Sequence, residues 1–342
     1  MRPLLNVLYV TTEDSYLARQ GETICVHIGG EEKVRIPAHT LESIVCFGHT
    51  TVSTPLIGFC SERGIRLSFL SEHGRFYGRL EGSVSGNVLL RRAQYRAAST
   101  GEEAEKIAWS VVLAKVLNSR NVLLRAAREA PGEGDGERLR AAAEEMRLIA
   151  QQLEPSVGTD VLRGLEGAAA QMYFSAFDGM IRANRENFRF VARMRRPPPD
   201  RINALLSFLY TMLVHDTSAA LEAVGLDPQM GFLHSVRPGR PSLALDLAEE
   251  LRAPVCDRLA LSLVNLKQIQ GDDFEIGPTE VVLKDGSRRT LLAAWQQRKR
   301  EEVIHPYLNE RVMIGLIPHV QAQLLARHLR GDLDAYPAFH WR

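Results

Sequence analysis

The first segment whose residues could carry out chemistry is GLEGAAAQMYF at residues 164 to 174, where Glu166 lies between two glycines. The surrounding residues are strong helix formers, and a glycine inside a helix costs roughly 0.5 to 1 kcal/mol relative to alanine. Two glycines beside one carboxylate therefore need a reason, such as the close approach of another backbone or of a ligand. The alternative is that the glycines serve helix packing and that Glu166 is an exposed, solvated side chain.

The second such segment is GFLHSVRPGRPSLALDLAEELR at residues 231 to 252, which ends in an amphipathic helix. We expect this helix to begin at Pro241 or Ser242, with Leu247 and Leu251 on its apolar side. A solvated acidic face would explain the carboxylates of the other side, and so would a metal site. Those carboxylates belong to Asp246, Glu249, Glu250 and Asp257.

The loop before this helix contains His234, followed by Arg237 and Arg240. A lone loop histidine is more often a surface residue than a ligand, but the two arginines suit a polyanion that lies near a metal ion. One histidine with carboxylates and no thiolate favours a hard divalent cation, either Mg²⁺ or Mn²⁺. Such an ion assists phosphodiester hydrolysis and strand transfer, because it activates an attacking oxygen and neutralises charge on phosphate.

A basic stretch with interleaved aromatic residues runs from residue 182 to residue 201. Guanidinium groups match phosphate geometry, so contact with a DNA backbone is one interpretation. Ion pairing with acidic helices of the same domain is the other. The arginines are Arg182, Arg185, Arg189, Arg193, Arg195, Arg196 and Arg201. Weaker candidates for phosphate contact are Arg91, Arg92, Arg96, Arg298, Lys299 and Arg300.

The composition of the chain limits the classes of protein to which it could belong. The chain has 342 residues with a formal net charge of +1, so any nucleic-acid surface must come from local clustering of charge. Its four cysteines are far apart, which predicts reduced thiols, and its longest uncharged helical stretch, residues 204 to 214, is shorter than the ~20 residues of a membrane span. We expect a soluble cytoplasmic protein. The chain lacks the HExxH, GxSxG and GxGxxG motifs and the phosphate-binding P-loop.

The first 86 residues predict a small β domain that resembles a sandwich, because short β-branched runs alternate with turn signals. Gly29-Gly30 and His73-Gly74 lie where hairpin turns are expected, and a helix is expected over residues 55 to 63. The expected strands are LNVLYV, ETICVHI, KVRIPA, ESIVCF, IRLSFL and RFYGRLEG.

From residue 87 the pattern becomes helical, so the fold class is α+β with an all-α C-terminal domain over residues 101 to 342. Residues 87 to 100 are expected to form a linker, and Thr100 with Glu103 has the form of a capping box. A short hairpin near residues 280 to 284 is expected to turn at Asp285-Gly286. Helices are expected over residues 101 to 129, 137 to 154, 159 to 190, 201 to 224, 241 to 265 and 291 to 330.

Taken in order, these motifs resemble the CRISPR-associated protein one family, the integrase of CRISPR spacer acquisition. The resemblance rests on a β-rich N-terminal domain followed by a helical domain with GLEG and an aromatic residue shortly after, then GFLH, then a helix that reads DLAEELR. It covers nearly the whole chain. The ordered set is highly specific, although each motif alone is weak.

Carried over residue by residue, the resemblance implies that Glu166, His234 and Asp246 are the catalytic, metal-binding residues. Glu249 lies where many members have a further acidic residue, and only the resemblance favours it over Glu250 as an additional ligand. The expected phosphate contacts are Arg182, Arg185, Arg189, Arg237, Arg240 and Arg252.

The resemblance also implies a homodimer held largely by the N-terminal domains, a complex with CRISPR-associated protein two, and Mg²⁺ or Mn²⁺ as cofactor. The implied reaction joins the 3′-hydroxyl ends of a short DNA duplex into a repeat array by transesterification. Two other functions are left open by the residues themselves. One is a plain metal-dependent DNA nuclease, and the other is a non-enzymatic dimeric DNA-binding scaffold.

Overall fold

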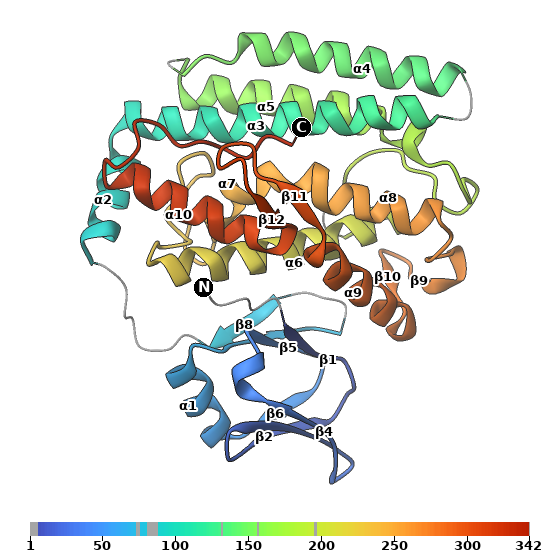
Figure 1. Ribbon diagram of the computed structural model, residues 1–342. Coiled ribbons are helices and arrows are strands. Elements are labelled where there is room, and N and C mark those ends of the chain that lie inside the picture. The colour runs from blue at the N-terminus through green and yellow to red at the C-terminus, as the bar shows by residue number, and fades with distance from the viewer. Residues whose placement is uncertain are drawn as a thin grey trace. The chain divides into compact units, whose positions relative to one another are not determined.

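The computed structural model describes residues 6–72, 76–80, 88–130, 133–155, 157–194 and 197–341. The chain divides into two compact units, residues 1–85 with 283–296 and residues 86–282 with 297–342 (Figure 1). Strands dominate the first part of the chain and helices the remainder, which confirms the predicted mixed α and β class.

Two four-stranded sheets make up most of the first unit. One has the order β1-β5-β7-β8, in which β8 alone is antiparallel to its neighbour. The other has the order β4-β3-β2-β6, in which β6 alone is parallel to its neighbour. The strands are β1 (Val7–Val10), β2 (Ser15–Gln20), β3 (Thr23–Ile28), β4 (Glu31–Pro37), β5 (Ser43–Phe47), β6 (Thr50–Val52), β7 (Arg66–Leu70) and β8 (Phe76–Leu80).

One hydrophobic core joins both sheets to α1 (Thr54–Arg63). Ile44 and Leu67 of the first sheet and Leu17 and Ile24 of the second are all completely buried in it. Both sheets therefore contribute side chains to one core, although β5 is buried along its whole length and not on one face alone.

The strands of the first unit agree with the sequence pattern except at two places. β2 and β6 were not expected, because SYLARQ mixes polar and apolar residues without clean alternation and TTV is only three residues long. Gly29 and Gly30 both have positive φ and make the predicted turn between β3 and β4. The second predicted turn, His73-Gly74, lies outside the described residues.

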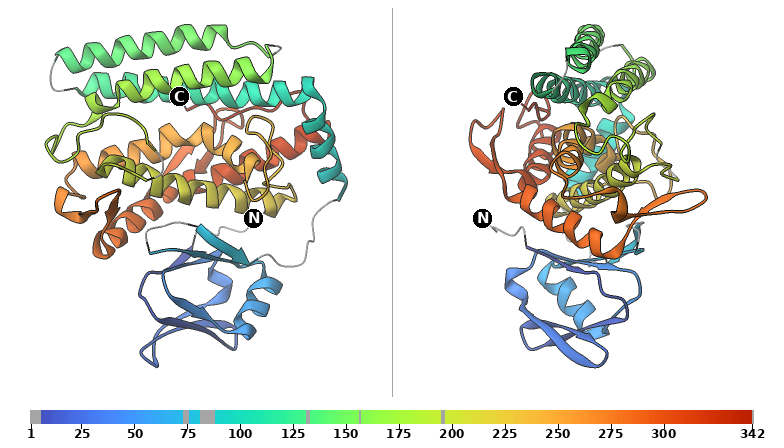
Figure 2. Two further views of the ribbon diagram at one scale, coloured as in Figure 1. Left: turned by 180° about the vertical axis from the view of Figure 1, so that it is seen from behind. Right: turned by 90° about the vertical axis from the view of Figure 1, so that its right-hand side faces the viewer.

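The second unit is built around α7 (Ser242–Leu251), which contacts both α3 (Gly101–Glu129) and α6 (Arg201–Val224). α3, α4 (Glu133–Gln152) and α5 (Thr159–Ser175) all pack against one another, and the right-hand view of Figure 2 shows the three helices nearly end on. Further helices of this unit are α2 (Val88–Ser99), α8 (Arg258–Asn265) and α10 (Ile317–Leu329), whereas most of α9 (Asp285–Arg300) belongs to the first unit.

The C-terminal part of the chain is not all-α. It contains two short antiparallel ribbons, β9 (Phe274–Ile276) with β10 (Val281–Leu283) and β11 (Glu302–Ile304) with β12 (Arg311–Met313). The hairpin turn predicted at Asp285-Gly286 is wrong, because these residues begin α9. The capping box predicted at Thr100 is also absent, since the Thr100 hydroxyl donates to Arg96 O (2.9 Å).

Three expected helices are interrupted, and the one expected over residues 291 to 330 is divided by β11 and β12. The helix expected over residues 241 to 265 is divided by a π-helical turn, Arg252–Asp257, that contains Pro254. Proline has no N–H to continue the α-helical hydrogen bonds, and π turns are often found at functional sites. The helix expected over residues 159 to 190 ends at Ser175 and is followed by a 3₁₀ turn, Phe177–Met180.

Two helices, α3 and α6, are long and apolar enough to cross a membrane by length and composition. Their most apolar windows are 61% and 72% buried inside the fold, as in the core helices of a globular protein.

Candidate metal centre

The loop before α7 is held by one buried carboxylate. Asp246 Oδ2 accepts the backbone N–H groups of Phe232 (2.6 Å) and Leu233 (3.0 Å), and Oδ1 accepts that of His234 (2.9 Å). Gly231 lies so close that a Cβ there would be 2.8 Å from Asp246 Oδ2, so this position requires glycine. Asp246 therefore fixes the backbone of residues 231–234 against the first turns of α7.

The imidazole of His234 is oriented by the same carboxylate. Its Nδ1 lies 2.7 Å from Asp246 Oδ1, while its Nε2 points toward Glu249 Oε1 at 3.8 Å. A carboxylate that accepts from Nδ1–H fixes the tautomer and leaves the Nε2 lone pair for a metal ion. Asp246 makes all four of these contacts, so in this structure it supports the histidine and its loop, and its role as a metal ligand stays a prediction.

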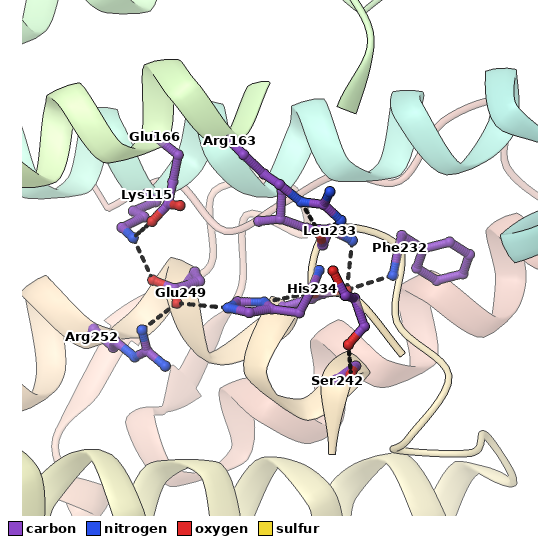
Figure 3. Close-up of polar contacts among 11 residues, drawn as sticks. Lys115, Arg163, Glu166, Phe232, Leu233, His234, Ser242, Glu249 and Arg252 are labelled. Carbon is purple, nitrogen blue, oxygen red and sulfur yellow. Dashed lines mark hydrogen bonds and ion pairs between the residues drawn. The ribbon is translucent and has the colours of Figure 1, made fainter. Parts of the chain in front are cut away.

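Two carboxylates from different helices face each other across one ammonium group (Figure 3). Lys115 of α3 makes ion pairs with Glu166 of α5 and, at 2.8 Å from Oε2, with Glu249 of α7. Among the described residues no three His, Cys, Asp or Glu side chains form a group that could hold an ion as placed, and Lys115 pairs with both of these carboxylates. Glu249 Oε2 has no partner with hydrogen-bond geometry, so a buried oxygen is left incompletely satisfied.

Glu249 is buried among positive charges. Burial alone would raise the pKa of its carboxyl, but the charges of Arg252 and Lys115 outweigh burial and hold the pKa well below the usual range. Arg252 makes an ion pair with Glu249, and its guanidinium lies 5.0 Å from the centre of the Tyr210 ring. The carboxylate is therefore ionised and fixed, as a metal ligand must be.

The π turn brings a further acid to this region. Asp257 accepts hydrogen bonds from the hydroxyls of Tyr173 (2.9 Å) and Tyr210 (2.6 Å), and burial raises its pKa to about 6. It lines, with Glu166 and Glu249, a cavity of about 60 Å³. This space is enough for an ion with a few waters.

Glu250 faces away from this site, although it is adjacent to Glu249 in sequence. Its carboxylate accepts from the Tyr336 hydroxyl (2.6 Å), the Phe339 N–H (2.8 Å) and the Gln321 amide (2.9 Å). Burial, which is the largest effect, raises its pKa to about 7. Of the two neighbouring glutamates, the structure therefore brings Glu249 to the candidate site.

This raised pKa predicts a pH dependence of stability. A carboxyl whose pKa is raised by folding stabilises the fold while protonated, and the stabilisation is lost as the pH rises through the folded pKa. Between pH 4.5 and about 7, Glu250 is expected to lower the free energy of unfolding by up to roughly 3 kcal/mol. Urea unfolding at pH 5 and pH 8 measures this fall, which Glu250→Gln should reduce; an equal fall in both proteins would contradict the assignment.

Two alternative interpretations of the sequence were a solvated acidic face on α7 and glycines beside Glu166 that serve helix packing. The acidic side of α7 is not solvated, since Asp246, Glu249, Glu250 and Asp257 are at most 2% exposed. A Cβ added at Gly164 or Gly167 would meet no described atom within 4 Å, so close packing of a backbone does not explain these glycines.

Three of the six predicted phosphate-binding arginines are engaged within the protein. Arg182 pairs with Glu129 (3.2 Å) and Arg185 with Asp135 (2.7 Å), as the alternative interpretation expected. Arg252 is only 8% exposed, so it holds Glu249 and does not face solvent. Arg189 and Arg237 are exposed and Arg240 is half-buried, and none of these three pairs with a carboxylate that the structure describes. Engaged or buried members of the wider set are Arg193, Arg201, Arg298 and Lys299, whereas Arg195 and Arg196 lie outside the described residues.

Two residues of the site were missed. Lys115 had one detectable signal, since it is the single charged residue in the stretch IAWSVVLAKVLNS. Arg163 had none. Its guanidinium donates twice to Leu233 O (2.9 and 2.7 Å), and it thereby ties the helix that carries Glu166 to the loop that carries His234 (Figure 3).

Comparison with known proteins identifies a matching family. Residues 8–297 match the family model described as CRISPR associated protein Cas1. A protein of Chlorobaculum tepidum named CRISPR-associated endonuclease Cas1 1 is 49% identical, and one of Rhodospirillum rubrum named CRISPR-associated endonuclease Cas1 2 is 50% identical. Both alignments cover 100% of this chain and 100% of the relative.

Solved structures share the fold. A CAS1 protein from Thermotoga maritima superposes with a TM-score of 0.80 at 25% identity, over 95% of this chain and 97% of that one. A chain of a Cas6-RT-Cas1–Cas2 complex superposes with a TM-score of 0.81 at 22% identity, over 98% of this chain and 36% of that one.

Proposed function

This chain belongs to the CRISPR associated protein Cas1 family, and from that premise we propose that it joins the 3′-hydroxyl ends of a short DNA duplex into a repeat array at a metal ion held by Glu166, His234 and Glu249. The enzyme is a CRISPR-associated endonuclease that acts in spacer integration. The observation that carries the assignment of the site is that two carboxylates meet at one ammonium group and that one of them, Glu249, also faces Nε2 of an oriented imidazole.

The residues fit a divalent cation. Lys115 places one positive charge between two carboxylates, which is where a cation is favoured, and the contact of Glu249 Oε2 with this ammonium group lacks good hydrogen-bond geometry. The donors are carboxylate oxygens and one imidazole nitrogen, which suit Mg²⁺ or Mn²⁺. When bound, such an ion activates an attacking oxygen and offsets the charge that develops on the phosphate.

Residues around the ligands position them. Asp246 holds His234 with its Nε2 free, Arg252 holds Glu249 from the side opposite Lys115, and Arg163 anchors the histidine loop to α5. Supporting contacts of this kind affect metal affinity or activity by roughly 10- to 100-fold. The open space beside Gly164 and Gly167 leaves room for a DNA strand next to Glu166.

The wider assembly follows from the family. The protein acts on double-stranded DNA as a cytoplasmic homodimer joined through its N-terminal domains, and it assembles with CRISPR-associated protein two. A chain of the same fold is part of a complex that contains Cas2, which supports this partner. Phosphates are contacted by the accessible arginines Arg189, Arg237 and Arg240.

The rival function is hydrolysis at the same site. With water as nucleophile, these residues would make a plain metal-dependent nuclease, and only the products distinguish the two reactions. A non-enzymatic scaffold does not fit, because the relatives that align along the whole chain are named endonucleases.

A plasmid integration assay tests the proposal. Wild-type protein with its partner, a short duplex and Mg²⁺ or Mn²⁺ is expected to yield joined strands, and Glu166→Gln is expected to lose them while still binding DNA. Glu145→Gln, which neutralises an exposed glutamate of α4, is the matched control and should join as wild type does. Shortened strands without joined product would instead identify a nuclease.

A further inference from the structure

A second polar hollow lies in the helical unit, away from the metal centre. It has a volume of about 580 Å³ and lies between α3, α4, the π turn with the start of α8, and the end of the chain. The C-terminal segment that closes it is seen beside α3 in Figure 1. Its size falls within the range of about 300 to 1,000 Å³ that small-molecule sites have.

The C-terminal segment that lines this hollow is held in place by several contacts of Trp341. Asn118 accepts the Trp341 N–H (2.6 Å), and the Asn121 amide donates to Trp341 O (2.6 Å). The guanidinium groups of Arg258 and Arg298 lie 5.4 and 5.5 Å from the centre of the Trp341 ring. Trp341 is thus fixed at its backbone, and its ring holds two cations that would otherwise repel each other.

The lining is strongly basic. It contains Arg125, Arg128, Arg140 and Arg258, and no acidic side chain among the described residues lines it. Arg125 pairs with Glu129 (3.2 Å), whereas the other three form no ion pair with any carboxylate that the structure describes. Burial, and then repulsion from neighbouring arginines, lowers the pKa of Arg258 to about 10.

This arginine pocket, defined by the four lining arginines and Trp341, is separate from the metal centre. At about 100° per residue, Asn118, Asn121 and Arg125 lie on one face of α3, while Lys115 and Ser119 lie on another. The first group lines the arginine pocket and the second lines the cavity beside Glu166.

Unpaired guanidinium groups in a hollow are suited to phosphate. Their forked donors match phosphate oxygens, and several cations at one place favour a polyanion over a single carboxylate. A flat acidic protein surface would not reach into a hollow, whereas a nucleotide unit has the size to enter it. We propose that the arginine pocket binds a phosphodiester segment of DNA as an anion site distinct from the metal centre. That the ligand is DNA rests on the proposed function.

Salt-dependent DNA binding tests this site. Arg128→Gln with Arg140→Gln removes two exposed charges of the pocket, and the full-length protein is titrated with a fluorescent duplex at several salt concentrations. Each lost phosphate contact is expected to reduce the slope of log K against log salt by about 1, so the double variant should lose about 2. Arg138→Gln with Arg327→Gln removes two exposed arginines outside the pocket and should leave the slope close to that of wild type.

Equal slopes for the pocket variant and its control would overturn the proposal. It would also fail if the pocket variant lost only the binding of a free deoxynucleoside monophosphate, since the pocket would then serve a small ligand. Glu166→Gln in the same titration separates the two hypotheses, because it should keep the wild-type slope and lose joined product. A wild type that binds DNA with the expected slopes but never joins it would contradict the proposed function alone.

Discussion

Glu249→Gln is expected to reduce metal-dependent DNA cleavage and joining by on the order of a thousandfold, with DNA binding kept. The substitution removes the one ionised carboxylate that faces both His234 Nε2 and Lys115. Metal stabilisation of developing charge is worth several kcal/mol, and each 1.36 kcal/mol of the barrier is about tenfold in rate. Single-turnover strand joining across a Mg²⁺ or Mn²⁺ titration measures the loss.

Glu250→Gln is the matched control for this variant. The two glutamates are adjacent and equally buried, but Glu250 contacts the C-terminal segment and not the metal centre. Below pH 7 its carboxyl is largely protonated, so glutamine resembles it in charge. If Glu250→Gln abolished joining at unchanged stability while Glu249→Gln did not, the assignment of the ligand would be reversed.

Asp246→Ala is expected to lower the free energy of unfolding by roughly 3 to 5 kcal/mol, because it leaves buried partners without an acceptor. Three backbone N–H groups and the His234 ring lose the carboxylate that they share. Urea denaturation with a circular dichroism signal measures the change. A loss of this size identifies a structural role that a metal ligand at the surface of a cavity would not have.

Glu166→Gln is the comparison for stability. Glu166 is partly exposed and contacts a lysine side chain, so its replacement should change the free energy of unfolding by less than about 1 kcal/mol. An Asp246→Ala protein as stable as wild type, with activity restored by more Mn²⁺, would show instead that Asp246 is a ligand.

The elements with local signals were predictable from the sequence. α6 has the predicted bounds, since Asp200 caps its first turn by accepting the Asn203 N–H (2.7 Å) and Gly225 ends it with positive φ. α7 begins at the predicted Ser242. The π turn was not predictable, because Pro254 after a helical pattern indicates a break but not its geometry.

Which acidic residue of α7 we propose as a metal ligand, and which as the support of a ligand, depends on tertiary structure. Asp246 and Glu249 are three residues apart on one helix and share a face, so helical periodicity cannot tell a ligand from its support. The difference arises because the loop at residues 231–234 folds back onto Asp246 alone. Lys115 comes from a helix more than 100 residues earlier, a contact that no local pattern contains.

The basic stretch shows the same dependence. The sequence predicts Arg182 and Arg185 as phosphate contacts. In the structure, Glu129 of α3 and Asp135 of α4 pair with them instead. A run of charged residues indicates that ionic partners are present, but it does not identify them. Here the folded protein itself supplies the partners of Arg182 and Arg185.

The π turn at Arg252–Asp257 makes this region sensitive to chain length. A wider turn accommodates one residue more than an α-helical turn does, and with it Arg252 meets Glu249 while Asp257 reaches Tyr173 and Tyr210. Deleting one residue there would restore α-helical phase and rotate every later residue of α8 relative to α7. Homologous sequences should therefore keep the number of residues between positions 252 and 257 constant.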